Sequence, residues 1–135
     1  MDSIYLRLNK IEKRLEGEEF FEGGLSYCFE VEELKMSMED IKPLKDVLVS
    51  VKAINASDEL ILKQIENSKD DIDSLCSEWH FADDIRNDLL DIIEDADIYR
   101  LGDEEYYITS GSTYSVFRLL VKDDEYILME FYRTD

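Results

Sequence analysis

The chain has 135 residues, of which 34 are acidic and 15 are basic, so its formal net charge at pH 7 is −19. This balance argues against direct binding to DNA or RNA, because affinity for a polyanion comes largely from lysine and arginine. The same negative field raises the encounter rate with basic partners, by about tenfold to a thousandfold at low salt. The composition therefore favours a basic protein as the partner.

Length and apolar content predict one folded domain over residues 1–135. The apolar fraction of 44% is too high for a disordered acidic tail, and a chain of this length buries roughly two thirds of its unfolded surface. No stretch approaches the ~20 apolar residues needed to cross a bilayer, the N-terminus has no export signal, and Cys28 and Cys76 form no disulfide framework. We expect a cytoplasmic protein with reduced cysteines and no membrane partner.

The first half of the chain predicts a helix, a strand and one ambiguous segment. Apolar residues recur at helical spacing over residues 4–15, where the outer face is locally basic, and alternate at strand spacing over residues 25–31. Residues 40–54 fit either a helix or a strand. Pro43 in the first turn, with Asp40 as a cap, favours the helix.

Two helices are predicted for the centre of the chain. The first is capped by Ser57 and runs through Trp79, and the second carries the cleanest apolar stripe of the chain, from Phe81 to Ala96. His80, at the break between them, is better explained as a packing or capping residue than as a proton shuttle. We expect the two helices to form an antiparallel or sharply angled pair.

From Ile98 onward the apolar period changes to two. This period predicts strands at 98–101, 105–109, 114–121 and 125–133, separated by turn residues. The predicted class is therefore α+β, with N-terminal and central amphipathic helices packed on a C-terminal antiparallel β-meander.

For the last predicted hairpin, the alternation also predicts which side chains meet on each face of the sheet. On one face Phe117, Leu119 and Val121 are expected to meet Ile127, Met129 and Phe131, and on the other Arg118 is expected to pair with Glu130.

The strongest functional signal is the acidic stretch from residue 70 to residue 105. It has fourteen carboxylates and two arginines, so about a quarter of the chain carries more than half of the net charge. Asp84, Asp88, Asp91 and Asp95 have the spacing of one helical face. Like charges at this spacing cost a few tenths of a kcal/mol per pair, and no lysine offsets them here. The stripe is either a solvated face or a surface that binds a partner.

Tyrosines are the second feature, because six of the eight lie in the predicted C-terminal sheet. An alternating pattern cannot bury all of them on one face, so some must be exposed. Tyrosine suits an interface, although it is also a common strand residue. The predicted partner-binding residues are Asp83, Asp84, Asp88, Asp91, Asp95, Asp97, Tyr99, Tyr106, Tyr107 and Tyr114.

Motifs for catalysis, metal binding or cofactor binding do not stand out. The Asp71-x-Asp73 and Asp95-x-Asp97 pairs do not continue into a calcium-binding loop. One histidine and two distant cysteines offer no zinc arrangement, and the glycines lack the spacing of a phosphate loop. The sequence therefore predicts a protein that is not an enzyme and that has no metal or cofactor.

Three functions remain open. The first is an inhibitor that blocks a basic cleft of a toxin or nuclease-type effector. The second is a phage anti-defence protein that mimics nucleic acid, and the third is a small enzyme or ligand-binding domain with an unidentified pocket. A small acidic α+β chain with exposed aromatic residues resembles bacterial immunity proteins and phage-encoded inhibitors in general character, a likeness of type that no single residue carries.

Overall fold

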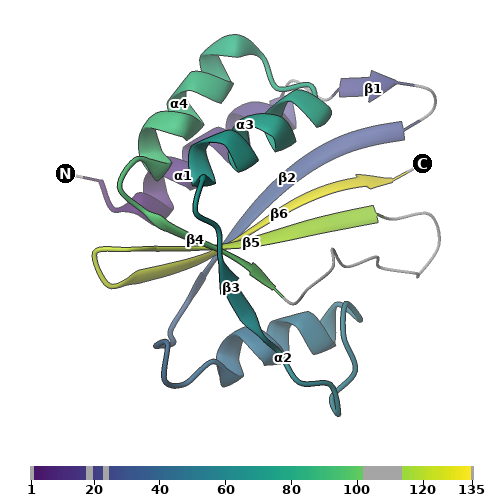
Figure 1. Ribbon diagram of the computed structural model, residues 1–135. Coiled ribbons are helices and arrows are strands. Elements are labelled where there is room, and N and C mark those ends of the chain that lie inside the picture. The colour runs from purple at the N-terminus through teal and green to yellow at the C-terminus, as the bar shows by residue number, and fades with distance from the viewer. Residues whose placement is uncertain (1, 18–19, 23–24, 102–113, 135) are drawn as a thin grey trace.

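The computed structural model describes residues 2–17, 20–22, 25–101 and 114–134 (Figure 1). A six-stranded antiparallel sheet with strand order β1-β2-β6-β5-β4-β3 forms its centre. Helices α1, α3 and α4 cover one face and α2 packs on the other (Figure 1). The elements are α1 (Ile4–Gly17), β1 (Phe20–Glu22), β2 (Leu25–Leu34), α2 (Lys42–Ser50), β3 (Leu62–Gln64), α3 (Ser68–Glu78), α4 (Asp83–Ile93), β4 (Asp97–Leu101), β5 (Tyr114–Lys122) and β6 (Glu125–Thr134).

The α+β class is confirmed. The helices predicted for residues 4–15 and for Phe81 to Ala96 are also formed, as α1 and α4. The spacing of apolar residues in α1 and α4 directs Leu8 and Leu89 into the core, where both are fully buried. The ambiguous segment forms the helix α2, with Pro43 in its first turn. Ile41 and not Asp40 occupies its N-cap position, but the Asp40 side chain, one residue earlier, accepts a hydrogen bond from the Lys42 N–H at 3.4 Å.

The predicted long helix from Ser57 to Trp79 is wrong in its first half. Residues 62–64 form the edge strand β3, which pairs with β4, and α3 begins only at Ser68. The Ile65 N–H also donates to the Ile98 carbonyl at 2.8 Å. Apolar residues spaced over so few positions fit a helix and a short strand equally well, and the sheet edge supplies hydrogen-bond partners that the sequence does not reveal.

The last hairpin is formed as expected, but its faces differ from the prediction by one residue. Phe117 lies opposite Glu130, and Arg118 lies opposite Met129. Because helices cover both faces, residues 115–120 of β5 are buried on both sides, and alternation therefore could not identify the faces. The predicted strand at 105–109 lies outside the described residues, and β4 pairs directly with β5.

Two apolar cores lie on the two sides of the sheet. The larger, under α1, α3 and α4, includes Trp79 and Phe131, whose ring centroids are 6.0 Å apart. The smaller, under α2, includes Leu48 and Leu119, which are both fully buried. No helix among the described residues is long and apolar enough to span a bilayer.

A buried ion pair attaches α3 to the face of the sheet that α1, α3 and α4 cover, which we call the covered face. Arg118 is only 3% exposed, and its guanidinium donates to both carboxylate oxygens of Asp71, at 2.8 and 3.1 Å. It also donates to the Phe117 carbonyl at 2.9 Å. A charge this deep is tolerated only when it is paired and hydrogen-bonded, so Asp71 is the residue that makes Arg118 compatible with the core.

His80 ends α3 in a Schellman motif. Its backbone has a positive φ of 61°, its N–H donates to the Ser77 carbonyl at 3.2 Å, and the next N–H, of Phe81, donates to the Cys76 carbonyl at 2.9 Å. The imidazole packs edge-on against the ring of Tyr27 at 4.9 Å. The structure therefore gives His80 the capping and packing role expected of it.

Candidate functional site

The predicted acidic stripe lies mainly on α4. Asp84, Asp88 and Asp91 are exposed on this helix, opposite its buried apolar face. Asp83 is exposed in the first turn, where the helix dipole favours a carboxylate. Asp95 is also exposed, but it follows the end of the helix and has a positive φ of 64°. The stripe therefore has three members on the helix and a fourth in the turn after it.

The chain neutralises part of this stripe itself. Arg14 of α1 forms ion pairs with Asp84 at 2.7 Å and with Asp88 at 2.6 Å. Within the described ranges Asp91 has no ion pair of this kind. The basic outer face of the first helix is visible in the sequence, but only the packing of α1 beside α4 shows that it meets the acidic stripe.

The predicted tyrosines do not lie on one surface. Tyr114 is half-buried on the helix-covered face, stacked on Trp79 with ring centroids 6.0 Å apart, and the Arg133 guanidinium lies 4.6 Å from its ring centroid. Tyr99 lies on the opposite face, packed against the smaller core, and burial raises the pKa of its hydroxyl. Tyr106 and Tyr107 lie outside the described residues.

Asp97 is also separated from the helical stripe. It is exposed at the start of β4 and accepts a hydrogen bond from the Gln64 side-chain amide at 3.1 Å. The eight predicted residues that the structure describes therefore do not form one continuous surface, and the acidic part of the set is centred on α4.

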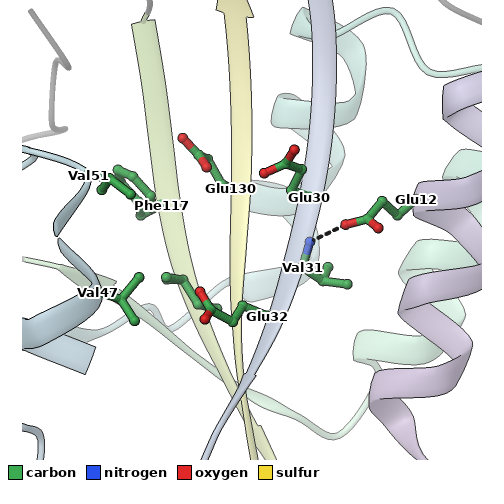
Figure 2. Close-up of a pocket in the computed structure, with 9 residues that line it drawn as sticks. Glu12, Glu30, Val31, Glu32, Val47, Val51, Phe117 and Glu130 are labelled. Atoms are coloured by element: carbon green, nitrogen blue, oxygen red, sulfur yellow. Dashed lines mark hydrogen bonds between the residues drawn. The ribbon is translucent and has the colours of Figure 1, made fainter. Parts of the chain in front are cut away.

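A second acidic surface, which the sequence did not single out, lies on the α2 side of the sheet. Here a groove of about 320 Å³ opens beside α2, and we call it the glutamate groove (Figure 2). Its lining consists of Glu12, Glu30, Val31, Glu32, Val47, Val51, Phe117, Leu128 and Glu130. An acidic side formed by β2 and β6 thus faces an apolar side formed by α2 and β5.

Two glutamates of the groove face each other directly. Glu30 of β2 is the cross-strand partner of Glu130 of β6, an arrangement that is destabilising for like charges. The Tyr132 hydroxyl donates to Glu30 Oε1 at 3.0 Å, and the Ser115 hydroxyl donates to Glu130 Oε2 at 2.7 Å. Both donors are neutral, so they satisfy oxygens without offsetting charge.

Burial sets the electrostatics of Glu130. Its pKa is raised above the ordinary value, first by burial and then by the negative charges of Glu30 and Glu32, against the opposing hydrogen bond from Ser115. In the described part of the chain no lysine or arginine forms an ion pair with any of the three glutamates. The groove is thus a concentration of negative charge without an internal counter-ion.

Glu12 has a different role at the same place. It extends from α1 to the edge of the sheet, where its Oε1 accepts a hydrogen bond from the Val31 N–H at 2.8 Å (Figure 2). This contact gives the Val31 N–H a side-chain acceptor, and it lies beyond residues 25–27 of β2, with which β1 pairs, so it covers part of an edge that could otherwise pair with another chain. Glu12 is therefore engaged in the fold.

The described residues contain no group of three histidine, cysteine or acidic side chains placed to hold a metal ion. Cys76 is buried, and burial raises the pKa of its thiol to about 12, which keeps it protonated at neutral pH. Comparison with family models, with curated proteins and with solved structures finds no match for this chain. A functional proposal therefore depends on the geometry of its own residues.

Proposed function

We propose that this protein is a stoichiometric inhibitor of the immunity or antitoxin type, which binds the basic cleft of a toxin or nuclease-type effector in the cytoplasm. The observation that carries the proposal is the exposure of Asp83, Asp84, Asp88, Asp91 and Asp95 on and directly after α4. Four of these carboxylates project from a helix whose other face is anchored in the core, and Asp95 follows its end.

Charge supports a protein partner of this kind. With a net charge of −19 the chain attracts basic surfaces at long range, which raises association rates, and close carboxylate pairing then provides specificity. Arg14 does not prevent this use of the stripe. Its side chain is 39% exposed, and exposed ion pairs contribute about 0–1 kcal/mol, so arginines of a partner can replace it.

The experiment begins with capture of binding proteins from lysate of the native host. The protein and a variant with Asp84, Asp88, Asp91 and Asp95 changed to Asn are compared at low and raised salt. We expect a basic protein to be retained by the native form, released by salt and lost by the variant. The captured protein is then purified and titrated calorimetrically, with an expected stoichiometry of one to one, and its enzymatic activity is assayed with and without the inhibitor.

A control variant changes the same number of charges elsewhere. Glu39, Glu59, Glu66 and Glu78 are exposed and lie off α4, so their change to Gln alters net charge equally without touching the stripe. Retention by this control together with loss by the stripe variant supports the proposal. Equal binding by both variants, or capture without inhibition of the purified partner, contradicts it.

A further inference from the structure

We propose that the glutamate groove receives an arginine side chain of the basic partner, with its guanidinium at Glu30 and Glu130 and its aliphatic stem on Val47 and Val51. This inference rests on the proposed function and deepens it, because it adds to the α4 stripe a second, distinct anchor on the other side of the sheet.

The first support is an incompletely covered sheet face. Helix α2 buries Phe117, Leu119 and Leu128 on this face, so β4, β5 and the neighbouring half of β6 have a helical cover. On the same face Glu30 and Glu32 of β2 are exposed beside that cover. The boundary between the covered and the uncovered part is the groove, and it combines an apolar side with a charged one (Figure 2).

The second support is charge that the chain cannot offset internally. All of its lysines and arginines lie within the described ranges, and none pairs with Glu30, Glu32 or Glu130. Residues 102–113, which lie outside those ranges, include no basic residue that could supply the missing charge. A like-charge pair placed directly opposite across two strands costs stability, and a cation from outside removes that cost.

The third support is the match between the groove and a guanidinium. Glu30 and Glu130 lie on adjacent strands, which are about 4.8 Å apart. The planar guanidinium offers five N–H donors in a fork that pairs with carboxylates on two sides, whereas an ammonium is a compact point charge. One oxygen of each glutamate accepts from Tyr132 or Ser115, and no donor among the described residues occupies the other oxygen, which can accept from an arginine.

The apolar side accounts for the rest of the arginine side chain. Val47 and Val51 are half-buried and line the groove opposite the carboxylates (Figure 2). An arginine stem of three methylene groups can cover such a surface while its charged end reaches the acids. A bare inorganic cation would leave these valines unused, which is why a side chain of a protein is the occupant we infer.

The test uses the full chain and short neutral peptides as probes. One heptapeptide carries a single central arginine between glycine and serine residues with blocked ends; a second carries citrulline, which has the same shape without the charge; a third carries lysine. Binding is followed by backbone amide shifts in two-dimensional NMR. We expect the arginine peptide to shift amides of β2, β6 and the end of α2, the lysine peptide to bind several-fold more weakly, and the citrulline peptide not to bind.

A paired variant separates the groove from general charge. E30Q/E130Q is expected to bind the arginine peptide about tenfold more weakly, whereas E33Q/E39Q, which removes the same charge from exposed positions outside the groove, leaves binding within about twofold. Circular dichroism and urea unfolding test whether E30Q/E130Q is folded, and we expect a native spectrum and a cooperative transition. Equal weakening by both variants, shifts confined to α4, or binding of the citrulline peptide would overturn the inference.

Spermidine is added as a competing probe. If it binds the groove more tightly than the arginine peptide, the occupant is a small polyamine and the inference is wrong. The proposed function fails independently of this result, because it depends on inhibition of a captured partner and on the α4 variant. A groove that binds the arginine peptide in a protein without such a partner would leave the groove inference standing and the inhibitor proposal refuted.

Discussion

The two faces of the sheet differ in whether their charged side chains have counter-ions within the described chain. On the face covered by three helices, the buried Arg118 has Asp71, and the exposed Asp84 and Asp88 have Arg14. On the partly covered face, Glu30 and Glu130 lie opposite each other and accept hydrogen bonds from neutral hydroxyls. The comparison teaches that the charges packed between helices, or between helix and sheet, have internal counter-ions, whereas the glutamates paired across β2 and β6 have none among the described residues.

The largest expected effect concerns the buried pair on the covered face. Changing Asp71 to Ala leaves the Arg118 guanidinium buried without its counter-ion, so the free energy of unfolding should fall by about 3–5 kcal/mol. Urea unfolding followed by circular dichroism measures this. Asp70, which is exposed in the same helical turn, is the control, and its change to Ala should alter stability by no more than about 0.5 kcal/mol. If Asp71→Ala lowered the free energy of unfolding no more than Asp70→Ala does, the ion pair would not be needed to hold α3.

An intermediate effect of opposite sign is expected on the partly covered face. Changing Glu130 to Gln removes a half-buried charge that faces Glu30 and Glu32, so stability at pH 7 should rise, by about 0.5–2 kcal/mol. The Ser115 hydroxyl can still donate to the amide oxygen of the new side chain. The control is Glu33→Gln, an exposed change on the same strand as Glu30, which should have little effect.

The same residue predicts a pH dependence with a definite sign. Because the pKa of Glu130 is higher in the folded than in the unfolded chain, the folded state binds more protons between the two values. This residue therefore makes the native protein lose stability as pH rises from the unfolded-state pKa through the folded-state pKa, and E130Q should lack this contribution. Urea midpoints measured from about pH 4 to about pH 7 test it; a variant that is less stable than the native protein throughout would refute it.

The smallest expected effect concerns Arg14 on the covered side. Changing Arg14 to Gln removes two exposed ion pairs, so the free energy of unfolding should fall by no more than about 1 kcal/mol, and the difference should shrink at high salt. Lys13→Gln is the matched control, an exposed cation on the same helix. A loss that is insensitive to salt would mean that Arg14 stabilises α1 by packing and not by charge.

Local pattern was enough to predict several parts of this fold. The helices α1 and α4 have long apolar stripes, and Asp123-Asp124 forms the predicted turn between β5 and β6, with positive φ at both residues. Three members of the acidic stripe, Asp84, Asp88 and Asp91, were predictable as well, because their spacing is a property of one helix, whereas Asp95 lies in the turn after it. These features depend on residues close together in the chain, where periodicity and turn chemistry are informative.

Features that join distant residues were missed or assigned to the wrong place. Glu125 accepts hydrogen bonds from the N–H groups of Ile4 and Tyr5 at 3.1 and 3.3 Å and so caps α1 from the far end of the chain. The alternation of Glu30 and Glu32 was visible, but it indicates only the polar side of a half-buried strand. No pattern within a short stretch of sequence indicates that Glu125 meets the start of α1 or that Glu30 meets Glu130.

The sequence by itself determined the α+β class, the amphipathic helices and the excess of negative charge, because composition and periodicity are local properties. Only the tertiary structure decided which charges are neutralised. Arg14 meets the acidic stripe because α1 packs beside α4, and Glu30 meets Glu130 because β2 pairs with β6. Electrostatic interactions depend on distance and burial in space, and the chain order of the residues specifies neither.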